Sequence, residues 1–209
     1  MSAEHRRPVT QPSRAFDWVI GSDDAGSALK LANETAWALL HRVRDGADPE
    51  VVDRVVHLAA ESGIDDVAEL WSNASPHTLA GQLWRIYLLQ RIVATNPEET
   101  AHFFRQGMEA APTIHPLVAG VADPIAPNSI AELCRTILRG VFAGDLAVAL
   151  ERASSYCRVM SLGTAAVADD RDNFHDEQAT MLTTRSLRYS ALADELHAGA
   201  RRWQDGTLG

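Results

Sequence analysis

The stretch that decides the fold runs from Ser129 to Met160 and reads SIAELCRTILRGVFAGDLAVALERASSYCRVM. In its first half the apolar residues recur at i, i+3, i+4 and i+7, the spacing of one helix face. Gly144 and Asp145 then interrupt the pattern, and the same spacing resumes after them. Two amphipathic helices joined by a tight turn predict an antiparallel helical hairpin.

The rest of the chain is also predicted to be helical. Asp48, Ser75 and Asn96 each precede a proline, which places a capping side chain before a residue suited to the first helical position. No segment has the strict alternation of a strand. The pattern predicts further helices over residues 24–44, 49–62, 67–71, 76–95, 97–111 and 174–203. We expect an all-α fold, a single multi-helix bundle of about seven to nine helices with a long C-terminal helix.

Two internal loops and an N-terminal arm complete the predicted organisation. Four prolines within residues 111–128 block regular helix and predict a loop, either a lid or a wrapping segment. A second loop is predicted from Leu162 to Asp172. Residues 1–14 lack an apolar pattern and are expected to form a disordered arm, which leaves residues 15–209 as a single helical domain.

Composition narrows the class of protein. The chain has 209 residues, 46% of them hydrophobic, and a net charge of −9. General nucleic-acid binding needs a basic face, so this charge argues against it. No apolar run approaches the ~20 residues of a membrane-spanning helix, and no secretory signal is evident, so we expect a cytoplasmic protein without membrane contact. Lys30 is the only lysine, and such a strong preference for arginine indicates a high-GC bacterium.

Few residues carry a recognisable chemistry. Cys134 and Cys157 both fall on the apolar stripes of the hairpin, which favours reduced core thiols. If the hairpin brings the two together, a redox disulfide is the alternative.

A helix-turn-helix over residues 58–69 is disfavoured because its second helix would open with three carboxylates. The motifs of serine nucleophiles and phosphate-binding loops are absent from the sequence, so we predict no catalytic residues and no cofactor.

Two acidic groups nevertheless suggest a metal. Glu99 and His102 have the i, i+3 spacing of carboxylate-bridged di-iron bundles, and His175, Asp176 and Glu177 belong to the densest cluster of oxygen ligands. Each group has a simpler explanation. Glu99 stands at a capping-box position, and carboxylates are favoured in the first turn of a helix. A metal-dependent helical enzyme that uses these five residues is therefore one alternative function.

A ligand or partner site is suggested by the predicted helix over residues 76–95. Arg85 and Arg91 interrupt its apolar sequence, and Trp84 adjoins them. A buried arginine needs either a carboxylate partner inside the bundle or an anionic ligand. A pocket among Trp84, Arg85 and the proline-rich loop would make the chain a small-molecule-binding regulatory protein.

The C-terminal helix carries a seam of small and apolar residues from Ala179 to Trp203. Small residues at a seam let another helix approach closely. The seam is expected to pack onto the bundle of its own chain, and a homodimer contact through this helix is the alternative.

Residues 118–124 (VAGVADP) and 139–153 (RGVFAGDLAVALERA) resemble a small family of uncharacterised all-helical proteins of high-GC Gram-positive bacteria. The resemblance supports the source but implies no activity. The leading expectation is a non-enzymatic cytoplasmic protein that acts through macromolecular binding, an adaptor or regulator with an unidentified protein partner.

Overall fold

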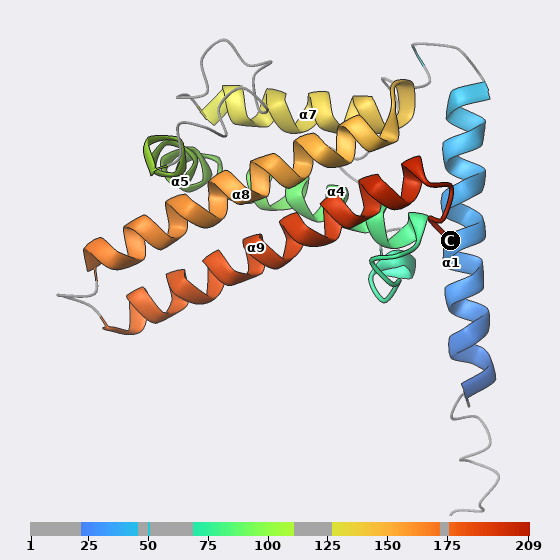
Figure 1. Ribbon diagram of the computed structural model, residues 1–209, viewed down its shortest axis with the longest axis horizontal. Coiled ribbons are helices and arrows are strands. Elements are labelled where there is room, and N and C mark those ends of the chain that lie inside the picture. Colours follow the sequence, from blue (N-terminus) through green and yellow to red (C-terminus); the bar gives the residue numbers. More distant parts are fainter. Residues whose placement is uncertain (1–21, 46–49, 51–68, 111–126, 172–175) are drawn as a thin grey trace, which may run out of the picture.

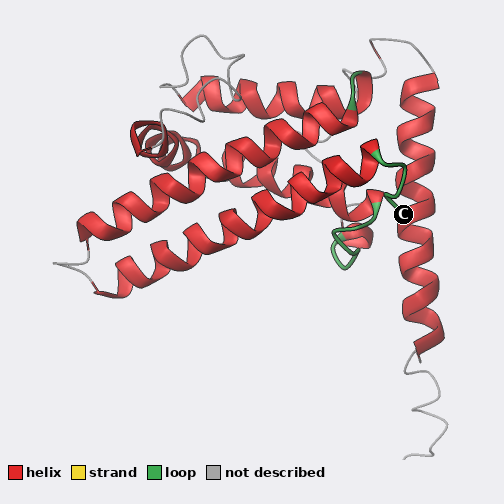
Figure 2. Ribbon diagram, viewed as in Figure 1, coloured by secondary structure: helices red, strands yellow, loops and turns green. Residues whose placement is uncertain are grey.

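The computed structural model describes residues 22–45, 50, 69–110, 127–171 and 176–209 (Figure 1). Every regular element in these ranges is a helix, and Figure 2 shows them joined by loops without a strand in the same part of the chain. The predicted all-α fold is therefore confirmed. Six helices have complete bounds: α1 (Ser22–Asp45), α4 (Leu79–Thr95), α5 (Pro97–Ala110), α7 (Pro127–Ala143), α8 (Leu146–Arg171) and α9 (Asp176–Gln204).

The predicted hairpin from Ser129 to Met160 is confirmed as α7 and the first half of α8. The break falls at Gly144 and Asp145. The side chain of Asp145 starts α8, because its Oδ1 accepts a hydrogen bond of 2.8 Å from the backbone N–H of Ala147. Apolar residues on both sides of the break, among them Val141 and Leu146, are fully buried. The hairpin is thus both capped and packed into the core.

The loop predicted from Leu162 to Asp172 is wrong, because α8 continues to Arg171. Gly163, within this segment, serves a close helix crossing. A Cβ atom at this position would lie 1.8 Å from the carbonyl oxygen of Phe103 in α5. Residues 165, 166 and 168 are alanine, the best helix former, and Val167 and Ala168 are buried, so the helix continues through this segment.

The long C-terminal helix is confirmed as α9, which lies alongside α8 (Figure 1). The predicted seam packs within the chain, with Leu182, Tyr189 and Leu196 buried. Hydroxyl groups tie the two helices together: Ser154 donates to the carbonyl of Ala193 over 2.8 Å. The expectation that the seam packs onto its own bundle is therefore confirmed.

The central helix α4 starts later than predicted. Its N-cap is Thr78, whose hydroxyl accepts from the N–H of Gly81, so the predicted start after Ser75 is wrong. The C-terminal residues pack against this helix start, where the N–H of Leu79 donates to the carbonyl oxygen of Gly209 over 3.1 Å. Ten residues of α4 are buried, as its apolar sequence predicts.

Helix α1 stands across the ends of the other helices, and its N-terminal part extends beyond them (Figure 1). From Ala32 onward one face is buried. Trp37 stacks on Trp203 of α9 with ring centroids 5.7 Å apart, and Arg44 donates to two carbonyls at the end of α7. These contacts fix the C-terminal two thirds of α1.

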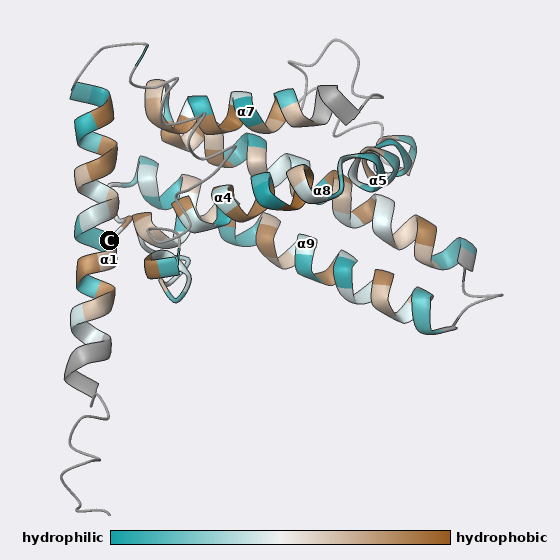
Figure 3. Ribbon diagram, turned by 180° about the vertical axis from the view of Figure 1, so that it is seen from behind, coloured by the Kyte–Doolittle hydropathy of each residue, from teal (hydrophilic) through white to brown (hydrophobic). Residues whose placement is uncertain are grey.

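Figure 3 shows how apolar and hydrophilic residues alternate along the helices. None of the helices described here combines the length and apolar character needed to cross a membrane. Several predictions fall on residues outside the described ranges: the N-terminal arm, the helix over 49–62 except residue 50, nearly all of the helix-turn-helix segment and of the proline-rich loop, and His175.

Candidate functional site

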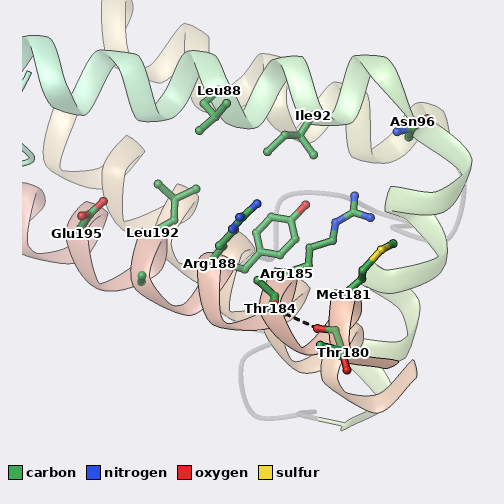
Figure 4. A pocket seen from close by; sticks show the side chains of 12 residues that line it. Leu88, Ile92, Asn96, Thr180, Met181, Thr184, Arg185, Arg188, Leu192 and Glu195 are labelled. Carbon is green, nitrogen blue, oxygen red and sulfur yellow. Dashed lines mark hydrogen bonds between the residues drawn. The ribbon is translucent and has the colours of Figure 1, made fainter. Parts of the chain in front are cut away.

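A groove between α4 and α9 is the candidate site (Figure 4). Its volume is about 890 Å³. Figure 4 shows Leu88 and Ile92 pointing from α4 toward Leu192 and Arg188 of α9. The described residues that line it are Leu88, Ile92, Asn96, Thr180, Met181, Thr184, Arg185, Arg188, Tyr189, Ala191, Leu192 and Glu195. The α9 side of the groove spans about 22 Å at 1.5 Å per residue.

The groove ends where α4 and α9 approach closely. At Gly199, a Cβ atom would lie 2.3 Å from the side-chain Cδ of Gln82. The amide of Gln82 also donates to the backbone carbonyl of Glu195 over 3.0 Å. The glycine and the buried glutamine therefore set the spacing of the two helices beside the groove.

One end of the groove is electrically neutral. The Nε of Arg85 lies 2.6 Å from the carboxylate of Glu195, and its Nη1 donates to the carbonyl of Gly81 over 2.7 Å. The side chain of Arg85 is only 12% exposed. Arg85 thus has the carboxylate partner inside the bundle that a buried arginine needs.

The middle of the groove carries a positive charge without an ion pair among the described residues. Arg185 is neutralised by Glu99, with 2.9 Å between Nη1 and Oε2, and it lies over the ring of Phe103 at 5.0 Å. Arg188 is exposed, and within the described part of the chain it forms no ion pair. The groove therefore presents one uncompensated positive charge on a chain whose net charge is −9.

The floor of the groove offers no base. Burial raises the pKa of Tyr189 to about 12, against the opposing effect of the Arg185 guanidinium. The phenol therefore stays protonated at neutral pH. Its hydroxyl forms no hydrogen bond of ordinary geometry with the described residues, although Arg185 lies close enough to influence it.

The residues that the sequence suggested as metal ligands are not gathered. Glu99 is paired with Arg185. The predicted capping box is not formed, because the backbone N–H of Asn96 donates to the carbonyl of Ile92 instead. His102 lies beside Phe103, with ring centroids 5.8 Å apart, and Glu177 is exposed. The side chain of Asp176 lies outside the description, as does His175. Among the remaining residues, no three His, Cys, Asp or Glu side chains are placed to hold a metal.

The suggested ligand residues lie beside the groove but do not line it. Trp84 is half-buried against Tyr87, and Arg91 is exposed. Sequence reasoning thus selected α4 and missed the α9 side. The sequence signal that could have identified the α9 side is the pair of arginines Arg185 and Arg188, which lie on α9 outside the apolar seam.

The two cysteines behave as core residues. Cys134 and Cys157 are free and buried. Burial raises the pKa of Cys134 to about 12 and also raises that of Cys157. Both thiols therefore stay protonated and unreactive at neutral pH, in agreement with the prediction of reduced core thiols.

Comparison of the chain with protein-family models, with curated proteins and with solved structures gives no match. The resemblance to a family of high-GC Gram-positive bacteria therefore stays a prediction, and the function must be argued from the groove.

Proposed function

We propose that this chain is a non-enzymatic helical protein, an adaptor or regulator, that binds a helical segment of a protein partner in the groove between α4 and α9. The groove itself is the observation that carries this proposal. An apolar cleft between two helices is the surface that accepts an amphipathic helix in the helix-in-groove mode of recognition.

The lining favours binding over catalysis. The described lining residues include no histidine, cysteine or lysine, and the one carboxylate among them, Glu195, is paired with Arg85. The phenol of Tyr189 is held in its neutral form. The hydroxyls of Thr180 and Thr184 would need a base to act as nucleophiles, and the described lining residues supply no free base.

The shape and rim of the groove suit a helix. Its α9 side, about 22 Å long, matches three to four helical turns. Met181 stands at the rim and is 64% exposed. Methionine is adaptable and is common on surfaces that receive helical partners.

We place the protein in the cytoplasm because its two cysteines are free within a packed core.

The experiment uses two matched variants on α9. Met181→Glu puts a charge into the groove, whereas Leu187→Glu changes a residue of similar exposure, 67%, that does not line it. The tagged proteins are used to capture partners from a lysate of the source organism. We expect one stoichiometric protein with the wild type and with Leu187→Glu, and its loss with Met181→Glu.

Equal retention by both variants would contradict the proposal, as would the absence of any retained protein. Circular dichroism spectra of the variants establish that each one is folded.

A small-molecule-binding regulatory protein is the second candidate, because about 890 Å³ lies within the range of small-ligand cavities. The apolar walls and Arg188 would suit an anionic amphiphile. If this candidate is correct, palmitate should raise the melting temperature of the wild type and of Leu187→Glu, but not that of Met181→Glu.

A further inference from the structure

The middle of the groove holds an arginine, Arg188, that has no carboxylate one turn away on its own helix. Thr184 and Arg185 stand one turn before it, and Ala191 and Leu192 stand one turn after it. Side chains three and four positions apart are neighbours on a helix surface, and like charges there destabilise the helix. The positions that most readily supply an exposed arginine with a counter-charge are therefore taken by apolar residues, a hydroxyl and a second arginine.

The other charged side chains of the described lining all have partners. Arg185 is paired with Glu99 of α5 over 2.9 Å, and Glu195 is paired with Arg85 of α4 over 2.6 Å. Neither carboxylate is therefore at the disposal of Arg188. Among the described residues, Arg188 is the charged group of this groove that has no ion pair.

The surroundings of Arg188 are apolar on both walls. Leu88 and Ile92 point toward it from α4, as Figure 4 shows, and both are half-buried, like Leu192 of α9. Met181, two turns before Arg188 on α9, is 64% exposed. A wholly apolar helix laid over these residues would cover the guanidinium without a counter-charge, and an unpaired charge is strongly unfavourable once it leaves water. A helix that fills the groove must therefore bring an anionic group to Arg188.

We propose that the groove selects an acidic amphipathic helix of another protein, whose Asp or Glu side chain pairs with Arg188 while its apolar side chains fill the groove on either side. This inference rests on the proposed function and names the chemistry of the partner. A carboxylate fits because it pairs with a guanidinium through charge-assisted hydrogen bonds. Apolar contacts beside the pair exclude water, which strengthens the attraction relative to an open surface.

The positions of the lining residues set the spacing of the partner sequence. Along α9, Arg188 lies about 6 Å from Leu192 and about 10 Å from Met181 at 1.5 Å per residue. A helix that follows α9 therefore needs an acidic residue about one turn from one apolar residue and about two turns from another. This spacing holds for either direction of the partner chain.

The test uses three stapled helical peptides of about 15 residues, the length that matches the α9 wall. Each has leucines at the spacing just given, and the three differ only in the residue opposite Arg188, which is glutamate, glutamine or lysine. Fluorescence anisotropy of the labelled peptides measures their dissociation constants. We expect the full-length wild type to bind the glutamate peptide roughly tenfold more tightly than the glutamine peptide, and the lysine peptide most weakly.

Charge reversal assigns the preference to one side chain. With Arg188→Glu the order should invert, so that the lysine peptide binds more tightly than the glutamate peptide. The matched control is Arg201→Glu, because Arg201 is also an exposed arginine of α9 but does not line the groove. This control should keep the wild-type order. Both changes are at exposed positions, and circular dichroism establishes that each variant is folded.

Three results would overturn the inference. Equal binding of the three peptides to the wild type, or an order that Arg188→Glu leaves unchanged, would refute the acidic partner and leave the groove as a site for an uncharged helix. Binding of palmitate through Arg188, with no binding of any peptide, would assign the groove to an anionic amphiphile. Failure of the peptides and of palmitate alike would refute the inference too, while the capture experiment with Met181→Glu still decides the proposed function by itself.

Discussion

The crossing of α5 and α8 at Gly163 gives the sharpest stability prediction. A Cβ atom at Gly163 would lie 1.8 Å from the carbonyl oxygen of Phe103 and 2.7 Å from the amide nitrogen of Gly107. Both neighbours are backbone atoms, so Gly163→Ala must push α5 away from α8. Displacing α5 also disturbs Phe104, which is fully buried.

The magnitude follows from two opposing effects. Alanine favours a helix interior over glycine by about 1 kcal/mol. Overpacking of a core costs about 1–3 kcal/mol, and a backbone clash belongs at the upper end or beyond it. We therefore expect Gly163→Ala to lower the free energy of unfolding by about 2 kcal/mol, and the melting temperature by roughly 4–8 °C for a chain of this size.

Urea denaturation followed by circular dichroism measures this effect. Gly140→Ala is the control, because its Cβ would meet only the Cβ of Ala149 in α8, at 3.4 Å, an ordinary van der Waals contact between α7 and α8. That variant should be as stable as the wild type or slightly more stable. If Gly163→Ala unfolds at the same urea concentration as Gly140→Ala, the close approach of α5 and α8 is refuted.

Three further predictions concern the core and the groove. Trp203→Ala removes the stack that holds α1, so amide hydrogen exchange in α1 should accelerate at least tenfold, while exchange in α8 changes little. Glu195→Gln deprives Arg85 of its carboxylate and should lower the free energy of unfolding by about 1 kcal/mol in urea titrations, a modest cost because the pair is partly exposed. Burial raises the thiol pKa values, so native Cys134 and Cys157 should resist iodoacetamide at pH 8, and the free energy of unfolding should fall above about pH 9, where thiols of the unfolded chain ionise. Rapid native labelling, read by mass spectrometry, would contradict the burial of the two thiols.

The sequence predicted the helices whose apolar stripes are regular. The two halves of the hairpin repeat at helical spacing, and local rules place a break at Gly144 and Asp145. The loop predicted from Leu162 to Asp172 is wrong, and within it Gly163 permits a close crossing of α8 with α5. This crossing brings α8 against α5, which lies about 60 residues earlier in the chain, and the sequence around Gly163 carries no sign of the contact.

The candidate site was only half predictable. Arg85 drew attention to α4 because a charged residue in an apolar helix requires a partner. Its partner, Glu195, comes from α9 and is fixed by the crossing at Gly199. The groove exists because two helices distant in sequence lie beside each other, and helical periodicity cannot predict which faces meet.

The central claim is that the groove between α4 and α9 holds a helical segment. A photo-crosslinking amino acid introduced at Thr184, which lines the groove, tests it most directly in cells of the source organism. We expect one major adduct, mapped by mass spectrometry to a helical segment, and little adduct from the same probe at Leu187. Equal labelling from both positions, or none from Thr184, would contradict the claim.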